Sequence, residues 1–259
     1  MIIIDGNNLL HRLAIERVGF GVHPVRQLFN RLCSPRETTI VVWDGPYANK
    51  RRKEIYPKYK ANRRPKEESK MEFFDVAKGV LSFTPVIQVE IPGWESDDVI
   101  GTLVRRYCAD HDITVETNDG DFWQLHTKCH LPLVSKKWHS HSEDSCLLFK
   151  ALVGEAKDNV TGIKGFGPKS WDGIPEKQRQ KLVAYLKTDD FRMFQASIWP
   201  LMPPAVRKRY SVAELWDEIK LCWKLNSFWN VPLDEVDANM KVGKQNFAAA
   251  EIYMEQFLI

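Results

Sequence analysis

The chain has 259 residues, of which 44% are hydrophobic and 27% are charged. This balance is typical of a folded globular protein and excludes a disordered or fibrous chain. No apolar run approaches the roughly 20 residues that cross a bilayer, so we expect no membrane span. The N-terminus reads as a strand without a basic leader, and the five scattered cysteines form no CxxC pair. We therefore expect a cytoplasmic protein with free thiols.

Strands and helices alternate along the first part of the chain. Runs of β-branched residues predict strands at 2–4, 38–43, 86–91 and 113–116, and helical spacing of apolar residues predicts helices at 9–15, 71–81 and 99–107. This order favours a mostly parallel sheet flanked by helices. Beyond residue 147 the predicted elements are helices, at 176–187, 211–225 and 248–257. We therefore predict an α/β domain over residues 1–147 and a smaller helical domain over residues 148–259.

The segment from Lys50 to Lys66 carries most of the positive charge. It holds nine Lys or Arg residues against one acid, whereas the whole chain has a net charge of only +3. A basic island on an otherwise acidic chain is typical of a phosphate-binding surface, although a solvated loop would read the same way. Tyr56 and Tyr59 favour nucleic acid, because aromatic rings among cations can stack on unpaired bases. The stretch from Lys50 to Met71 shows no hydrophobic periodicity, so we expect residues 50–69 to be mobile without DNA.

Acidic residues follow every predicted strand. Asp5 and Asp44 come directly after the first two strands; Glu95, Asp97 and Asp98 follow the third, and Asp119 and Asp121 follow the fourth. Each acid alone could be a turn residue or a helix cap. Together they should meet at one edge of a parallel sheet, where such folds bind ligands. Two carboxylates about 4 Å apart repel by roughly 1 kcal/mol even in water, so the cluster predicts bound cations. Several carboxylate ligands favour two Mg²⁺ ions, or Mn²⁺, as in phosphodiester hydrolysis.

A glycine-rich stretch follows Asp158. Gly162, Gly165 and Gly167 predict a tight hairpin between helices, a helix-hairpin-helix signal whose backbone can approach a DNA phosphate or a monovalent cation. Pro168 occupies the position at which a nucleotide-binding P-loop needs lysine, which excludes that motif. A group of histidines and cysteines also suggests zinc, but its spacing matches no standard finger, so we expect surface histidines and free cysteines. The group consists of His126, Cys129, His130, His139, His141 and Cys146.

Taken together, these motifs resemble the 5′ nuclease family, which includes phage 5′→3′ exonucleases, flap endonucleases and the 5′ nuclease domain of bacterial DNA polymerase I. The resemblance rests on Asp5, Trp43-Asp44-Gly45, the segment from Tyr56 to Arg63, Glu95 to Asp98, Thr117 to Asp121, and the stretch from Asp158 to Gly167. It runs from Met1 to about Ser170, and the size is similar to that of the phage enzymes. It implies a PIN-like fold and a 5′→3′ exonuclease or flap endonuclease active on DNA.

The resemblance also implies a role for each site residue. Asp5, Asp44, Glu95 and Asp97 would lie nearest one Mg²⁺, and Asp119, Asp121 and Asp158 nearest the other, with Asp98 completing the acidic motif. Glu155 stands where relatives commonly have Asp. Lys60 and Arg63 would contact the scissile phosphate from an arch over about residues 50–69, with Tyr59 stacking on a base. Further DNA contacts are expected from Arg51, Arg52, Arg64, Gly162, Lys164, Gly165, Gly167 and Lys169, with K⁺ at the hairpin.

The implied partner is DNA with a 5′ end, flap or nick. We expect the protein to bind it as a monomer in the cytoplasm, which would be the host cytoplasm if the chain is phage-encoded. Two other functions fit part of the sequence. A catalytically silent DNA-binding module would keep the basic segment and the hairpin, but the intact acids speak against it. A PIN-like ribonuclease would share the carboxylates and would need neither the arch nor the hairpin.

Overall fold

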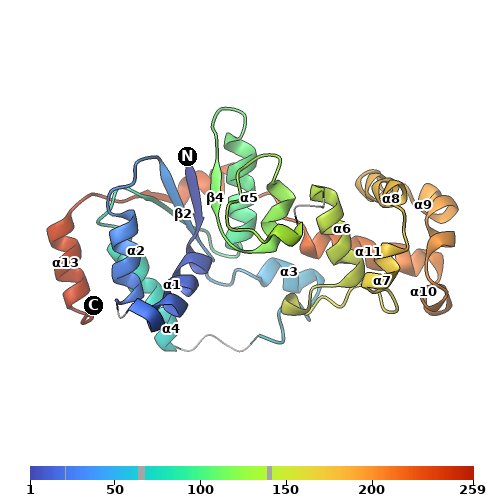
Figure 1. Ribbon diagram of the computed structural model, residues 1–259, viewed down its shortest axis with the longest axis horizontal. Coiled ribbons are helices and arrows are strands. Elements are labelled where there is room, and N and C mark those ends of the chain that lie inside the picture. The colour runs from blue at the N-terminus through green and yellow to red at the C-terminus, as the bar shows by residue number, and fades with distance from the viewer. Residues whose placement is uncertain (21, 64–67, 139–141) are drawn as a thin grey trace. The chain divides into compact units, whose positions relative to one another are not determined.

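The computed structural model describes residues 1–20, 22–63, 68–138 and 142–259, which form two compact units (Figure 1). The sheet unit consists of residues 1–51, 64–134 and 228–259, and the helical unit of residues 52–63 and 135–227. This division differs from the expected boundary at residue 147. Residues 228–259 return to the sheet unit, and residues 52–63 belong to the helical unit.

Five strands form the sheet, in the order β4-β1-β2-β3-β5. The four predicted strands are confirmed as β1 (Ile2–Asp5), β2 (Thr39–Trp43), β3 (Ile87–Glu90) and β4 (Thr114–Glu116). Neighbours among these four pair in parallel, so their carboxyl ends share one edge. The fifth strand, β5 (Met240–Val242), pairs antiparallel with β3. Its three residues are too few to show an alternating pattern, and the sequence analysis therefore missed it.

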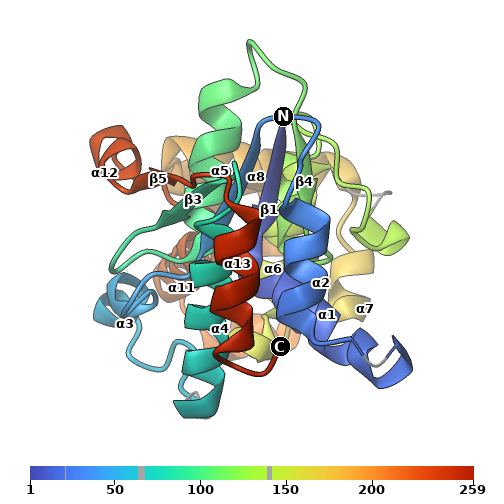
Figure 2. The ribbon, with the colours of Figure 1, turned by 90° about the vertical axis from the view of Figure 1, so that its left-hand side faces the viewer.

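Helices cover both faces of the sheet. On one face lie α1 (Gly6–Phe20), α2 (Pro24–Leu32), α4 (Glu68–Leu81) and α13 (Phe247–Glu255), in front of the strands in Figure 2. Leu10, Leu28 and Val80 from these helices form one buried core with Val41 and Trp43 of β2. The helix α5 (Ser96–Tyr107) packs against β1 and β2 but has no residue in this core. Because strand side chains alternate between faces, α5 covers the opposite face.

Three further elements complete the sheet unit and its border. The 3-10 helix Gly120–Leu125 follows β4, and α12 (Leu233–Ala238) precedes β5. The helix α3 (Lys50–Ile55) spans the border between the two units in sequence. Among the described helices, none has both the length and the apolar character needed to cross a membrane.

The helical unit is built around tryptophan and leucine. Its helices are α6 (Glu143–Val153), α7 (Pro168–Asp172), α8 (Glu176–Thr188), α9 (Phe191–Ser197), α10 (Pro204–Arg209) and α11 (Val212–Asn226), with 3-10 turns at Lys136–Trp138, Ala156–Asp158 and Trp199–Leu201. Trp171 and Trp216 are buried with Leu148, Phe194 and Ile219 in one core. A capping box between Ser211 and Glu214 fixes the start of α11.

The premise behind the expected mobility of residues 50–69, that the segment buries too little surface to be fixed, does not hold for residues 50–63. These residues form α3 and the turns that follow it. Arg52 is only 4% exposed and Tyr59 only 2% exposed, and burying these two side chains fixes a segment that looked fully solvated. Residues 64–67, and with them Arg64, lie outside the described residues.

Candidate functional site

The sheet unit gathers acidic side chains at the carboxyl edge of its parallel strands. Asp5 is the last residue of β1, and Asp44 directly follows β2, its parallel neighbour. Asp119 begins the 3-10 helix that follows β4, the other neighbour of β1. Asp44 and Asp119 lie close enough to Asp5 for their charges to raise its pKa. The structure thus brings these three acids together at the predicted edge.

Asp5 is the most buried member of this group, with 5% of its surface exposed. Its Oδ1 accepts a hydrogen bond from the backbone N–H of Asn8 at 3.0 Å, and its Oδ2 accepts one from the Thr117 hydroxyl at 3.2 Å. Burial raises the pKa of Asp5 from 3.8 to about 7, and the charges of Asp44 and Asp119 add to the shift. Near neutral pH a proton or a bound cation therefore stabilises the Asp5 carboxyl group.

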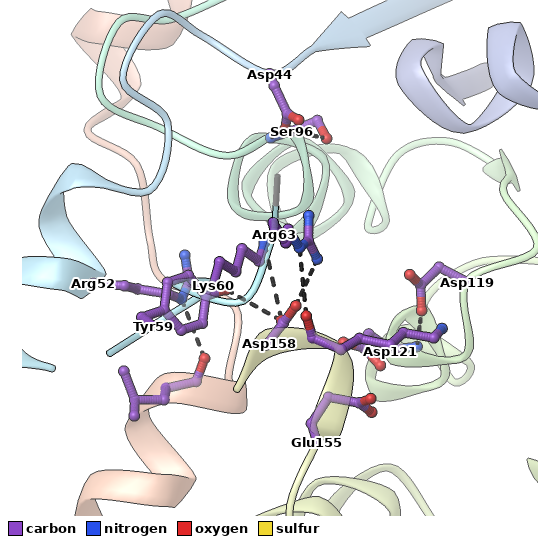
Figure 3. A network of polar contacts seen from close by, with 12 residues as sticks. Asp44, Arg52, Tyr59, Lys60, Arg63, Ser96, Asp119, Asp121, Glu155 and Asp158 are labelled. Atoms are coloured by element: carbon purple, nitrogen blue, oxygen red, sulfur yellow. Dashed lines mark hydrogen bonds and ion pairs between the residues drawn. The ribbon is translucent and has the colours of Figure 1, made fainter. Parts of the chain in front are cut away.

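Asp44 is held in place by donors from two other elements. Its Oδ1 accepts hydrogen bonds from the backbone N–H and the hydroxyl of Ser96, at 3.0 and 3.1 Å (Figure 3). Its Oδ2 accepts one from Asn7 Nδ2 at 3.2 Å. Gly45 permits this arrangement, since a Cβ at that position would lie 1.8 Å from the carbonyl oxygen of Ile91. Only glycine lets the end of β2 approach the chain that leads into α5 so closely.

Asp119 and Asp121 are placed by the start of the 3-10 helix. Asp119 caps this helix, because its Oδ1 accepts the backbone N–H of Asp121 at 3.0 Å. The backbone N–H of Asp119 in turn donates to the Thr117 hydroxyl at 3.1 Å. Thr117 therefore connects Asp119 to Asp5. Both acids are half-buried.

Glu95, Asp97 and Asp98 open α5 as the sequence predicted, but they differ in environment. Glu95 is buried at the N-cap position, and Asp97 is half-buried in the first turn. Asp98 is 1% exposed, and its Oδ1 accepts the backbone N–H of Trp229 at 2.8 Å. This bond ties the start of α5 to the chain that leads back into the sheet unit, and the expected ligand role of Asp98 stays a prediction.

In the helical unit, Asp158 is surrounded by cations from the basic segment. Arg63 Nη2 lies 2.6 Å from its Oδ1, and Lys60 Nζ lies 3.9 Å from its Oδ2 (Figure 3). The Tyr59 hydroxyl donates to Oδ2 at 3.3 Å, and the backbone N–H of Lys60 donates to the Asp158 carbonyl at 2.8 Å. The motif around Lys60 and the motif around Asp158, which lie about a hundred residues apart in sequence, thus form one polar cluster.

Two residues expected to contact DNA are buried and are corrected here. The Tyr59 ring packs in a small core with Ala151, Val160, Cys222 and Leu225, so it is not available for stacking on a base. The Arg52 guanidinium bonds two carbonyl oxygens at the end of α11, those of Leu225 at 3.1 Å and Ser227 at 3.0 Å. Arg52 therefore satisfies carbonyl groups that the helix leaves without partners, and it is not a phosphate contact.

Replacing Arg52 with alanine should destabilise the protein by about 2–4 kcal/mol, because two carbonyl groups lose their donor, at least one of them fully buried. Urea denaturation measures this change. The matched control is the exposed neighbour Lys53, whose replacement with alanine should stay within about 0.5 kcal/mol. Equal effects from the two variants would contradict the capping role.

Arg51 differs from its neighbour. Its side chain is 43% exposed, and its guanidinium lies 4.1 Å from the centre of the Trp94 ring. One guanidinium nitrogen also lies 3.9 Å from the Glu235 carboxylate. Within the sheet unit it is thus oriented by an aromatic ring and an acid while part of its surface stays accessible. Its expected contact with DNA stays a prediction.

Glu155 is paired with a lysine. Lys150 Nζ, on the last turn of α6, lies 3.0 Å from Glu155 Oε2. The backbone of Glu155 is also fixed, since it exchanges two hydrogen bonds with Val160 at 2.8 and 3.1 Å. The negative charge of Glu155, the residue that departs from the family pattern, is thus balanced by a lysine of the same unit.

The glycine-rich hairpin lies between α6 and α7, as predicted. Gly162 adopts a φ of 61°, and a Cβ there would lie 2.4 Å from the backbone nitrogen of Gly154. Only glycine allows the hairpin to approach the end of α6 this closely. Lys164, Gly165 and Lys169 are exposed, so the hairpin presents backbone and cations to solvent.

Within the described parts of the chain, no three His, Cys, Asp or Glu side chains lie close enough together to hold a metal ion as they stand. Of the histidines and cysteines considered for zinc, His139 and His141 lie outside the described residues. The described cysteines are free thiols, and Cys146 is buried and not at the surface. At the acidic edge, Asp5 and Asp44 direct their oxygens at hydrogen-bond donors.

The donors that position these acids are three polar side chains that the sequence motifs contain but do not single out. Asn7, Ser96 and Thr117 each bond Asp5 or Asp44 through a side chain. Their signal was present, because each lies within two residues of an acid in the motifs that carried the resemblance. Residue spacing alone does not show which polar neighbour points at which carboxylate.

Comparison with known proteins gives consistent matches. Residues 1–147 match the family model of the 5′-3′ exonuclease, N-terminal resolvase-like domain. The chain is 27% identical over 230 residues to the 5′-3′ exonuclease of Bacillus subtilis, a match that covers 77% of this chain and 75% of the relative. It is 26% identical over 246 residues to the thermostable DNA polymerase I of Thermus aquaticus, covering 87% of this chain but only 28% of the polymerase.

A solved structure with the same fold is the flap endonuclease of bacteriophage T5, in a complex with DNA and metal ions. The similarity covers 92% of this chain and 91% of that one, with a TM-score of 0.52 and 20% sequence identity. At this identity the likeness establishes the fold. The predicted α/β class with a mostly parallel sheet is confirmed.

Proposed function

Because the chain belongs to the 5′-3′ exonuclease family, we propose that it hydrolyses phosphodiester bonds of DNA near a 5′ end with the help of divalent cations. The observation that carries this proposal is the buried carboxyl group of Asp5, whose pKa is raised to about 7 beside Asp44 and Asp119. Folding this group into a low-dielectric environment next to two other acids is unfavourable. A bound cation relieves that cost, so the arrangement fits a cation site.

The donor set fits Mg²⁺ or Mn²⁺. The residues that would hold the ions in the sheet unit are Asp5, Asp44, Glu95, Asp97, Asp119 and Asp121. All are hard oxygen donors, which these ions prefer. Each oxygen of Asp5 accepts one hydrogen bond and can accept a second interaction. Asp158 belongs to the helical unit, and its ligand role stays what the resemblance implies.

When bound, such ions lower the pKa of a coordinated water and stabilise charge on the attacking and leaving oxygens. The residues of the chain supply the positioning. Asn7 and Ser96 keep Asp44 from rotating, and Thr117 ties Asp5 to Asp119. A ligand that is already fixed adds little ordering cost when a cation arrives.

Lys60 and Arg63 are proposed to contact the phosphate under attack. Both are cations next to Asp158, at 3.9 and 2.6 Å. Fixed cations stabilise the negative charge that grows on a phosphate during hydrolysis. In this structure the negative partner of the two cations is the Asp158 carboxylate. A DNA phosphate would compete with Asp158 for the same two side chains.

The proposed partner is DNA that carries a 5′ end, as a flap or at a nick. The relatives named 5′-3′ exonuclease and the T5 flap endonuclease in complex with DNA support this choice. The exposed hairpin between α6 and α7 supports binding of a duplex, because backbone amides and lysines contact phosphates without regard to sequence. The same residues fit removal of nucleotides from the end and cleavage within a flap.

The test is cleavage of 5′-labelled flap, nicked and blunt DNA and of matching RNA, with Mg²⁺ and with EDTA. We expect cleavage of the flap and nicked DNA in Mg²⁺ only. A second readout is the melting temperature, which Mg²⁺ or the inert Ca²⁺ should raise by binding the folded state. Cleavage of RNA alone, or full activity in EDTA, would contradict the proposal.

A further inference from the structure

The hairpin between α6 and α7 rests against a short basic helix of the same unit. A Cβ built on Gly165 would lie 3.5 Å from the Cβ of Ala205 and 3.7 Å from Val206 Cγ2, both on α10. The Tyr210 hydroxyl, directly after α10, accepts the backbone N–H of Lys164 at 3.3 Å. Figure 1 shows α7 and α10 within the helical unit. These contacts fix α10 at the tip of the hairpin.

The face of α10 that meets the hairpin continues into two cations. Lys208 and Arg209 follow Ala205 by three and four residues, the spacing that places side chains on one face of a helix. Both are exposed, and no ion pair links either of them to a residue that the structure describes. Arg207 differs, because its Nε donates to the Met202 carbonyl at 3.0 Å and is occupied within the unit.

The hairpin and the first turn of α7 each carry one cation of the same kind. Lys164 and Lys169 are exposed, and neither is ion-paired within the described ranges. The nearby acid Glu214 is engaged in the capping box of α11, where it accepts the backbone N–H of Ser211 at 2.7 Å. Unpaired cations from two elements in contact form a surface whose positive charge is not cancelled locally. Such a surface fits a regular row of phosphates.

We propose that Lys208 and Arg209 extend the duplex-binding surface of the hairpin, each contacting a backbone phosphate of double-stranded DNA. The proposal rests on the proposed function and adds α10 to the DNA-binding residues. The hairpin supplies backbone amides and Lys164, which position one stretch of a strand. The exposed cations of α10 would add two phosphate contacts to those of the hairpin.

Cations at the C-terminal end of α10 also interact favourably with the helix dipole. This alternative role predicts a different experimental result. A dipole role would be seen in the stability of the protein and not in its affinity for DNA. A phosphate role would be seen in the affinity for duplex DNA and in its dependence on salt. The two roles are therefore separable in one set of variants.

The test is a double variant, Lys208→Ala with Arg209→Ala, measured by fluorescence anisotropy with nicked duplex DNA in Ca²⁺ at several salt concentrations. Each lost phosphate contact lowers the slope of log affinity against log salt by about 1, so the slope should fall by about 2. The affinity at low salt should fall at least tenfold. Binding of a single-stranded oligonucleotide should change much less.

The matched control removes two exposed cations from other helices of the same unit, Lys177→Ala with Arg192→Ala. Its net charge equals that of the test variant, and its salt slope should remain that of the wild type. Equal slopes for the test variant and the wild type, or equal losses in the test and control variants, would overturn the role of α10 while leaving the proposed function intact. A wild-type protein that binds no nicked duplex would overturn both.

Discussion

Replacing Asp119 with asparagine should lower the rate of DNA cleavage by about a thousandfold while the affinity for DNA is kept or increased. The substitution removes a charge beside Asp5 but preserves the local fold. Asparagine has nearly the same volume, and its Oδ1 can still accept the backbone N–H of Asp121. Losing one ligand charge that stabilises the transition state by about 4 kcal/mol corresponds to three orders of magnitude in rate. Removing a negative charge from a site that receives phosphates does not weaken binding.

Single-turnover cleavage in Mg²⁺ and equilibrium binding in Ca²⁺ measure the two quantities separately. The matched control is Asp190→Asn, because Asp190 caps α9 in the same way, with its Oδ1 accepting the backbone N–H of Met193 at 3.0 Å. That variant loses the same charge from a similar cap away from the strand ends and should cleave at the wild-type rate. Near wild-type cleavage by the Asp119 variant would show that this acid does not serve the reaction.

The parallel part of the sheet could be predicted because each strand carries its own local signal. Ile2–Asp5 and Thr39–Trp43 are short runs of β-branched residues, and both are buried. The domain boundary could not be predicted in the same way. It depends on β5, which pairs with a strand about 150 residues earlier in the chain. Long-range pairing of three residues leaves no local pattern.

The acidic edge could be predicted because strand ends locate it. Asp5 and Asp44 lie where the parallel order requires. The environment of individual side chains could not be predicted. Arg52 reads as one more cation in a charge run, yet its partners are carbonyl groups more than 170 residues away. Asp98 reads as a third acid in its motif, yet it bonds the backbone of Trp229. Burial by distant segments decided both cases.

Replacing Lys60 with alanine should reduce the cleavage rate by about a hundredfold and weaken DNA binding much less. Lys60 adopts a φ of 52°, a left-handed conformation that a side chain with a Cβ rarely takes, and its backbone N–H is bonded to the Asp158 carbonyl at 2.8 Å. The ammonium group lies 3.9 Å from the Asp158 carboxylate and 5.0 Å from the centre of the Tyr59 ring, and these two contacts orient it. A fixed donor at a phosphate contributes mainly when charge develops there, and its loss costs about two orders of magnitude in rate. Alanine keeps the Cβ, so the substitution changes the charge and not the backbone strain.

The matched control is Lys58→Ala, which removes an exposed cation two residues away in the same turn. No ion pair involves Lys58 among the described residues. This variant should therefore weaken binding slightly and lower the slope of log affinity against log salt by about 1. Its cleavage rate at saturating DNA should be unchanged. Single-turnover rates at saturating DNA, together with affinities in Ca²⁺, separate the two variants. If both variants lose affinity equally and keep the wild-type rate, Lys60 is a general phosphate contact. In that case its pairing with Asp158 orders the turn and does not serve the chemistry.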